Sequence, residues 1–256
     1  MAHFNSYIGI DYSGAGLPDK GLRGLRAFSA KPDEVPVEQR PKAGSPQHWS
    51  RRSLAYWLIE ILSNGGPTLV GIDHGFSFPM AYLEAYSLGV GWDEWLDDFV
   101  KAWPCHLEGV SVESQRPQNI RLGSSRWRRQ TEIVAGAKSI FHFDVPGSVA
   151  KSTHAGLPWL HHLRRSFGTR IHFWPMDGFE VPEGGSVLIE AYPSLWKGVQ
   201  GEIDGTPDQK DAYAISRMLE TLDRTGGLKA LWGPPQNLWI RNLALKEGWI
   251  FGVPFS

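Results

Sequence analysis

The sequence has few of the features that mark several large protein classes. Its only cysteine is Cys105, so no disulfide forms within the chain, which fits a reducing compartment. No apolar run approaches the roughly 18 residues of a membrane-spanning helix, and the N-terminus lacks a basic segment followed by a long apolar one. We therefore expect a cytoplasmic protein with no membrane partner. The net charge of −1 does not indicate nucleic-acid binding, so any affinity for phosphate must come from a local patch.

Several catalytic motifs are also missing. There is no Gly-x-Ser-x-Gly elbow, and Cys105 has no supporting context as a nucleophile. The nine histidines show no metal-ligand spacing. The stretch 150–153 (Ala-Lys-Ser-Thr) is only superficially like a phosphate loop, because no glycine precedes the lysine. These absences argue against a serine hydrolase, a cysteine nucleophile and a Walker-type nucleotide site.

Acids at the ends of short apolar runs are the strongest positive signal. Three runs, Tyr7–Asp11, Leu69–Asp73 and Val187–Glu190, each end in a carboxylate. Continuous apolar runs of this length are typical of buried central strands. Open α/β sheets place their ligands at the carboxyl edge, where these acids would gather. Because gathered carboxylates repel one another, the pattern predicts a Mg²⁺ or Mn²⁺ site.

The remaining pattern is that of a single α/β domain spanning 1–256. Residues 31–46 suit a surface loop with a short edge strand, and about 76–150 is the least regular part. We expect strands at 5–11, 22–29, 68–73, 139–144, 171–174 and 187–192, and helices at about 47–63, 92–103, 157–167, from 207 and at 236–246.

The helix that opens at residue 207 adds two more acids. Proline stands at its first position, and Thr206 with Gln209 forms a capping box. Asp208 and Asp211 are three residues apart, so both project from one side of the first turn. Asp211 is the better candidate ligand, since Asp208 is explained better as a first-turn residue that interacts with the helix dipole.

These motifs carry a family resemblance. The segments Gly9-Ile10-Asp11, Gly71-Ile72-Asp73 through Pro79, Ile189-Glu190 through Pro193 and Asp208 through Ala212 resemble the predicted nucleases of the "domain of unknown function 429" family. The acidic pair on the late helix also resembles the last motif of Holliday-junction resolvases. The resemblance implies a ribonuclease H-like mixed sheet with strand order 3-2-1-4-5, flanked by helices, with a helical or irregular insertion at about 76–150 after the fourth strand.

The resemblance also implies the chemistry. Two Mg²⁺ or Mn²⁺ ions would clamp an in-line displacement at a phosphodiester of DNA or RNA. Asp11 would bridge the ions, and Asp73, Glu190 and Asp211, with Asp208 as a fifth metal ligand, would bind one ion or its water. In a resolvase the second acid lies on the strand corresponding to 68–73, so Glu190 departs from that pattern.

Substrate contacts are expected at two places. Ser13 and Gly14 open a glycine-rich turn that could cradle a phosphate, or could simply cap the strand. Lys151 could reach a phosphate. Arg128 and Arg129 follow Trp127 in a basic segment suited to phosphate pairing and base stacking, although a solvated loop explains it equally well.

Two other functions stay open on the sequence alone. One is ATP-dependent phosphotransfer of the actin-like or sugar-kinase type, whose core is related and whose first phosphate motif resembles residues 9–14 weakly. The other is a non-catalytic binding module that keeps the fold without the metals. Metal binding separates this module from the two enzymes, and ATP binding separates the enzymes from each other.

Overall fold

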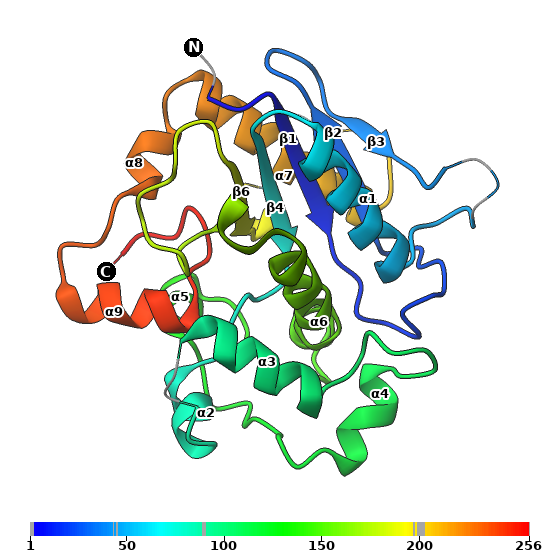
Figure 1. Cartoon of the computed structure of the whole chain (residues 1–256), viewed down its shortest axis with the longest axis vertical. Coiled ribbons are helices and arrows are strands. Elements are labelled where there is room, and N and C mark those ends of the chain that lie inside the picture. The colour runs from blue at the N-terminus through cyan, green and yellow to red at the C-terminus, as the bar shows by residue number, and fades with distance from the viewer. Residues whose placement is uncertain are drawn as a thin grey trace.

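The computed structural model describes residues 3–42, 44, 46–88, 91–196, 198 and 203–255. Within them, helices flank one mixed, six-stranded sheet, so the chain is an α/β protein (Figure 1). The strands lie in the order β3-β2-β1-β4-β6-β5. Their bounds are Ser6–Asp11 (β1), Arg26–Ala30 (β2), Val37–Gln39 (β3), Thr68–Asp73 (β4), Ile171–Phe173 (β5) and Ser186–Glu190 (β6).

This strand order differs from the expected order 3-2-1-4-5. The run β3-β2-β1-β4 agrees, but β6 is the next strand in the sheet and β5 lies beyond it at the edge. β2 is antiparallel to both of its neighbours, whereas β1, β4, β6 and β5 run parallel. The difference arises because the three-residue β5 adds a strand for which the expected five-strand order has no place.

The helices form two layers around the sheet (Figure 1). α7 packs on β1, β2 and β4, while α1 and α6 pack against each other on the opposite face. The bounds are Arg51–Asn64 (α1), Met80–Ala85 (α2), Trp92–Ala102 (α3), Val112–Gln115 (α4), Gln130–Val134 (α5), Ala150–Phe167 (α6), Pro207–Arg224 (α7), Leu228–Trp232 (α8) and Leu238–Glu247 (α9). Short 3₁₀ turns lie at Arg116–Gln118, Gly168–Arg170 and Pro193–Leu195.

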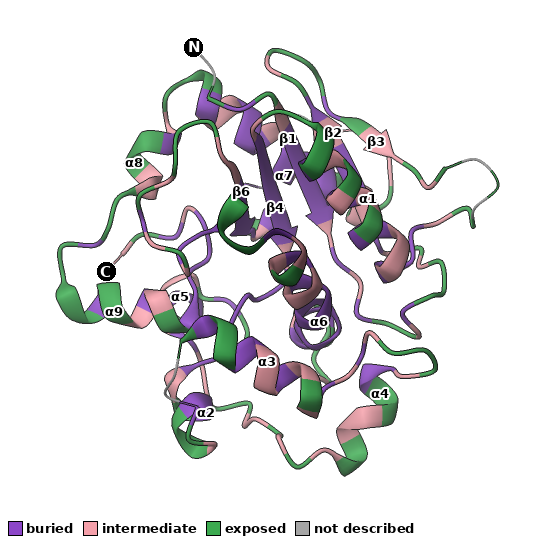
Figure 2. Cartoon of the chain, viewed as in Figure 1, coloured by how far each residue is buried: buried purple, intermediate pink, exposed green. Residues whose placement is uncertain are grey.

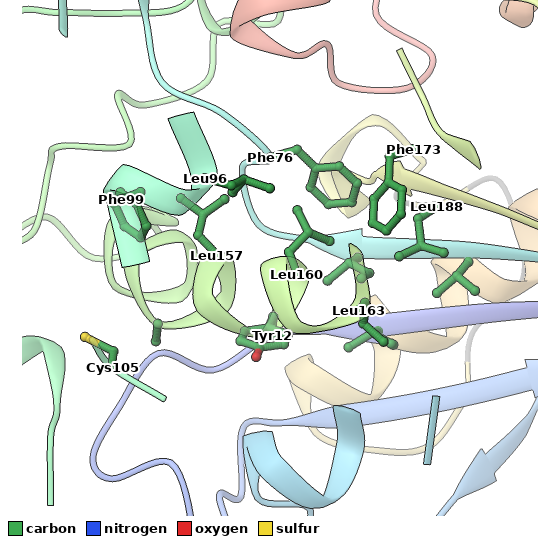
Figure 3. Packing of buried hydrophobic residues seen from close by; sticks show 14 of the residues in the cluster. Tyr12, Phe76, Leu96, Phe99, Cys105, Leu157, Leu160, Leu163, Phe173 and Leu188 are labelled. Atoms are coloured by element: carbon green, nitrogen blue, oxygen red, sulfur yellow. The ribbon is translucent and has the colours of Figure 1, made fainter. Parts of the chain in front are cut away.

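Alternation along the strands assigns their residues to the two faces. In β1, Ile8 and Ile10 belong to the larger hydrophobic cluster with α1 and α6, whereas Tyr7 belongs to the cluster around α7. We call these sides the α6 face and the α7 face. The central strands and most of α6 are buried (Figure 2), and Figure 3 shows Leu157, Leu160 and Leu163 of α6 in the larger cluster.

Two glycines allow α7 to approach the sheet closely. A Cβ atom on Gly9 would lie 2.2 Å from the carbonyl oxygen of Ala212, and one on Gly71 would lie 2.6 Å from Ile215. Only glycine fits at such distances. The Gly-Ile-Asp motifs of β1 and β4 therefore place a small residue under α7 and an acid two residues later, on the same face.

Some local expectations were wrong. Residues 139–144 form turns rather than a strand, because the Ser139 hydroxyl accepts from the Phe141 amide and contacts the Trp127 carbonyl. The helix expected at 157–167 begins earlier, at Ala150, and contains Pro158. Its first turns were missed because they carry few large apolar residues. No helix in the described ranges has both the length and the apolar character to cross a membrane.

The irregular segment at 76–150 shares the core of the sheet. It contains α2, α3, α4 and α5, and it contributes Phe76, Phe78 and Trp95 to the larger hydrophobic cluster. Phe78 alone has edge-to-face contacts with Tyr82, Trp95, Phe99 and Phe141. Phe78 also contacts the ring of His154 in α6, with ring centroids 4.9 Å apart, so the segment is fixed against α6 rather than left as a free loop.

Candidate functional site

Asp11 and Asp73 lie side by side at the carboxyl ends of two parallel strands. The register of β1 and β4 pairs Ser6 with Thr68 at one end and Asp11 with Asp73 at the other. Both acids continue the alternation that puts Gly9 and Gly71 beneath α7, so both belong to the α7 face. Both side chains are partly exposed. This edge is where open α/β sheets bind ligands.

The start of α7 brings two more carboxylates to this edge. Thr206 caps the helix with the predicted capping box, which fixes Asp208 and Asp211 in its first turns. Burial, together with the negative charges of Asp73, Asp208 and Asp211, raises the pKa of Asp11 to about 9. Asp11 also shares a hydrogen bond with Asp208, which requires a proton between the two carboxyl groups. Four of the five predicted acids therefore converge.

These side chains are not arranged as a finished metal site. In the part of the chain that the structure describes, no three His, Cys, Asp or Glu side chains stand where they would hold a metal ion. Asp11 and Asp208 lie against each other rather than around a space for a cation. The donor set nevertheless has the right chemistry, because Mg²⁺ and Mn²⁺ prefer carboxylate oxygens and keep several waters.

Glu190 does not join this cluster, which corrects the expectation that it binds metal beside Asp11. In β6, Val187 and Ile189 face α7, while Leu188 belongs to the α6-face cluster. Glu190 follows the same alternation as Leu188 and pairs in register with Ile72. It therefore continues the α6 face, on the other side of the sheet from Asp11.

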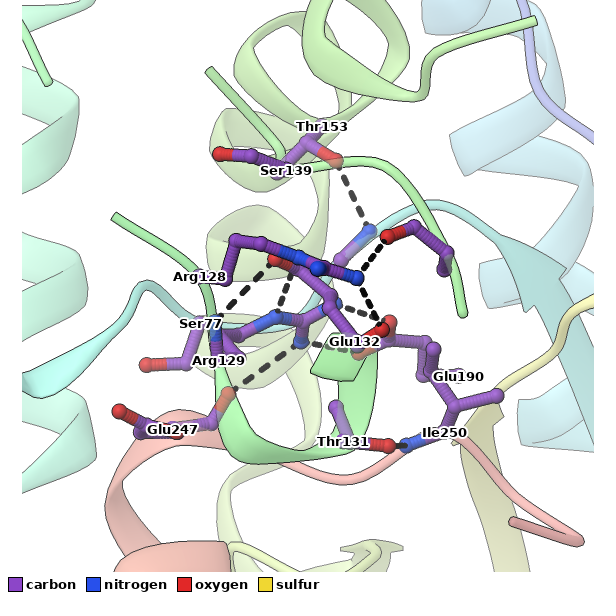
Figure 4. Close-up of polar contacts among 12 residues, drawn as sticks. Ser77, Arg128, Arg129, Thr131, Glu132, Ser139, Thr153, Glu190, Glu247 and Ile250 are labelled. Carbon is purple, nitrogen blue, oxygen red and sulfur yellow. Dashed lines mark hydrogen bonds and ion pairs between the residues drawn. The ribbon is translucent and has the colours of Figure 1, made fainter. Parts of the chain in front are cut away.

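The partner of Glu190 is Arg129, which was expected to bind substrate. The Arg129 guanidinium donates to both Glu190 oxygens at 2.7 and 2.5 Å and to Glu132 at 2.8 Å (Figure 4). All three side chains are buried. Burial alone would lower the pKa of Arg129, but Glu190 and Glu132 more than offset it and raise that pKa. Arg129 is thus occupied inside the protein and is not available to a phosphate.

This buried network joins four parts of the chain that are distant in sequence. Glu190 of β6 also accepts from the Phe76 amide, and Arg129 donates to the carbonyl of Glu247 at the end of α9. The Glu247 carboxylate in turn accepts from the Met80 and Gln130 amides. Breaking a buried ion pair costs about 3–5 kcal/mol, so the network is structural.

The other two basic candidates are also engaged. Arg128 donates through Nη2 to the carbonyls of Glu132 and Ala137. Lys151 lies in the first turn of α6, and its ammonium is 3.2 Å from Glu113. The expected basic patch at 128–129 therefore does not present two open cations, whereas Lys151 remains about half exposed.

The turn after β1 lies where the sequence suggested. Gly14 packs on the start of α6, since a Cβ atom there would lie 2.1 Å from the Lys151 carbonyl carbon. Ser13 borders the acids: its Oγ and the Asp208 Oδ2 each lie 3.6 Å from the Cβ position of Gly24. Ser13 is thus the predicted substrate contact that lies beside the cluster.

One further residue at this edge, Arg26, was not identified from the sequence. Arg26 of β2 stands opposite Asp11 of β1 in the antiparallel register of the two strands. Its guanidinium forms an ion pair with the Glu38 carboxylate at 3.0 Å. The antiparallel register would have identified it. His74, by contrast, is a packed residue: burial lowers its pKa to about 4, and its Nδ1 donates to the Gly75 carbonyl. It is neutral at pH 7, which does not favour a role as a proton relay for a histidine directly after Asp73 in the sequence.

Comparisons of the chain with protein-family models, with curated proteins and with solved structures find no match. The likeness to the domain-of-unknown-function-429 nucleases stays an expectation from the sequence, and the candidate site stands on its geometry.

Proposed function

We propose that the chain is a metal-dependent hydrolase of nucleic-acid phosphodiester bonds. The observation that carries the proposal is the convergence of Asp11, Asp73, Asp208 and Asp211 from two adjacent strands and one helix start. Their charges oppose one another, and a divalent cation relieves that repulsion at neutral pH. In this proposal a cation takes the place of the proton that Asp11 shares with Asp208.

The four aspartates would hold Mg²⁺ or Mn²⁺, with Asp11 at the centre because its pKa responds to the other three. Two such ions activate water and stabilise the leaving oxygen of a phosphodiester. Ser13 would contact the substrate from the loop beside Asp208. Arg129 and Glu190 would support the site from behind the sheet by fixing the ends of β6 and α9.

We further propose that the sheet is a variant of the ribonuclease H-like superfold. The support is the run β3-β2-β1-β4, with β2 antiparallel to both neighbours and β1 parallel to β4. Fold alone does not assign an activity, so the enzymatic proposal depends on the acids rather than on the sheet.

The test is a cleavage assay with matched carboxylate variants. Single-stranded, duplex, branched and hybrid substrates are incubated with Mg²⁺ or Mn²⁺. We expect Asp11→Asn and Asp73→Asn each to slow cleavage at least about 100-fold, the effect of removing a group that stabilises the transition state. Asp144→Asn is the control, because Asp144 is an exposed acid that pairs with Arg116 away from the cluster.

Three outcomes decide the proposal. Loss of cleavage in both cluster variants but not in the control supports it. Cleavage that survives in both variants places the active site elsewhere. No cleavage of any substrate, together with metal-dependent ATP turnover, replaces the proposal by phosphotransfer.

A further inference from the structure

A buried arginine, Arg51, lies behind the loop that follows β1. Arg51 is the first residue of α1 and is 0% exposed. Its Nη1 donates to the carbonyls of Ser13 and Ala15 at 3.1 and 2.8 Å, and its Nη2 donates to that of Gly16 at 2.7 Å. All three acceptors are neutral, and no carboxylate of the described residues forms an ion pair with Arg51.

Holding a loop with a buried guanidinium has a large cost in free energy. Desolvation costs several kcal/mol per ion, and here no counter-charge offsets it directly. Burial accordingly lowers the pKa of Arg51, although the side chain remains protonated at neutral pH. What only an arginine supplies is a planar fork of donors that binds three carbonyls of one short loop at once.

The consequence falls on the amides of this loop, which we call the β1 loop (Ser13, Gly14, Ala15 and Gly16). With three carbonyls bound to Arg51, the loop retains its N–H groups as unused donors. Among the described residues, none of these four amides donates to a protein acceptor. Gly14 is buried, and a buried amide without a partner is rare in a folded protein.

The loop borders the acidic cluster. It begins two residues after Asp11, and Ser13 lies beside Asp208. Successive backbone amides attract anions, and carbonyl oxygens repel them. A phosphate whose oxygens face a cation held by the aspartates would meet amides and the Ser13 hydroxyl on its other side.

We propose that Arg51 is a positioning residue that withdraws the carbonyls of the β1 loop and leaves its amides to bind a phosphate of the substrate. The inference rests on the proposed function only in taking a phosphate ester as the substrate. It adds a phosphate-binding element that is separate from the metal ligands, and it assigns that element to main-chain donors.

Three variants test the proposal. Arg51→Met removes the donors, Arg51→Lys keeps the charge, and Ala15→Pro removes one amide but keeps the carbonyl that Arg51 binds. Arg52→Met is the control, since Arg52 is the next residue and pairs with Asp19 on the surface. The measurements are binding of adenosine monophosphate with Mg²⁺ present, stabilisation by Mn²⁺, and the KM and kcat of any cleavage.

We expect Arg51→Met and Ala15→Pro to weaken adenosine monophosphate binding by about tenfold or more, and to raise KM more than they lower kcat. Arg51→Lys should recover part of the loss. The Mn²⁺ concentration for half-maximal stabilisation should stay within about twofold in every variant, because the metal ligands are untouched. Arg52→Met should bind like the wild type.

The proposal is overturned if Arg51→Met and Ala15→Pro bind adenosine monophosphate as the wild type does, or if the wild type binds Mn²⁺ but not adenosine monophosphate. If Arg51→Met does not fold, Arg51→Lys and Ala15→Pro decide. Weakened phosphate binding in these variants of a protein that cleaves nothing would uphold the phosphate element and reject the nuclease. The two failures are therefore distinguishable.

Discussion

The two ends of α7 carry acids in opposite circumstances. At its start, Asp208 and Asp211 meet the acids of β1 and β4, and a carboxyl group is hydrogen-bonded to a carboxyl group. At its far end, Glu220 and Asp223 are buried deeper than the acids at the start, yet each is surrounded by donors. Depth of burial therefore does not identify a functional acid in this helix. The identity of the neighbours does.

The far end is fully paired. Asp223 accepts from the amides of His3 and Phe4 and from the Tyr7 hydroxyl, at 2.8, 3.0 and 2.7 Å. Glu220 accepts from the side chains of Arg217 and Arg224, as well as from the Asp33 amide. Such carboxylates hold the N-terminal segment and the 31–34 turn to α7. The lesson is that carboxyl groups gathered beside one another, rather than an acid in the interior, mark a candidate site.

The largest expected effect is at the paired end. Asp223→Ala leaves two amides and the Tyr7 hydroxyl without their acceptor, so the free energy of unfolding should fall by about 3 kcal/mol. Urea unfolding of the variant and the wild type at pH 7 measures the difference. A loss below about 1 kcal/mol would break the comparison, because Asp223 would then be no more structural than the acids at the start of α7.

The pH dependence of stability sharpens the comparison between the two ends of α7 once the contribution of one buried histidine, His154, has been measured. His154 of α6 is enclosed by Phe78, Trp103 and Phe143, and burial lowers its pKa to about 3. Between pH 6.5 and about 3 the unfolded chain binds a proton there that the folded chain does not. Stability therefore falls as pH falls, by up to about 1.4 kcal/mol per pH unit for this one group.

His154→Leu should remove that contribution, so the stability of the variant should fall less steeply between pH 6 and 4. Urea unfolding at several pH values gives the slope. Equal slopes in variant and wild type would mean that His154 is protonated in the fold, despite its position among the rings. The acid sensitivity that remains in the variant then comes from the other titratable groups of the fold.

The smallest expected effect is at the repelling end, and it has the opposite sign. Asp11→Asn removes the cost of keeping a crowded carboxyl group protonated at neutral pH, so without metal the melting temperature should stay the same or rise, by an amount equivalent to about 1 kcal/mol. The same variant should lose most of the stabilisation that Mn²⁺ gives the wild type. Thermal scans with and without Mn²⁺ measure both. Asp208→Asn is the companion variant. It also removes an acid from the cluster, but it loses the favourable interaction of Asp208 with the helix dipole, which opposes the gain in stability.

Equal stabilisation by Mn²⁺ in Asp11→Asn and in the wild type would remove Asp11 from the metal ligands. A large drop in metal-free stability would show that Asp11 resembles Asp223. Either result would contradict the contrast between the two ends of α7.

The parts of the site that the sequence predicted are those fixed by local rules. The capping box at Thr206 set the start of α7, and the two Gly-Ile-Asp motifs put Asp11 and Asp73 at matching places on adjacent strands. Glu190 could not be assigned to a face, because every residue before it in β6 except Ser186 is large and apolar. Its partner Arg129 is 61 residues away, and no local pattern encodes such a pairing.

The close contact at Gly9 and Gly71 has a consequence for how this chain tolerates change. Most core contacts lie between side chains, which repack when a neighbour is substituted. At Gly9 the strand meets the backbone of Ala212 and Ser216 directly, whereas at Gly71 it meets the side chains of Ile215 and Leu219. Substitutions on the α6 face can accumulate without altering the spacing of the acids, whereas one methyl group at Gly9 displaces the helix that carries two of them. Sequence drift can therefore reshape most of this core while the geometry of the acids is inherited unchanged.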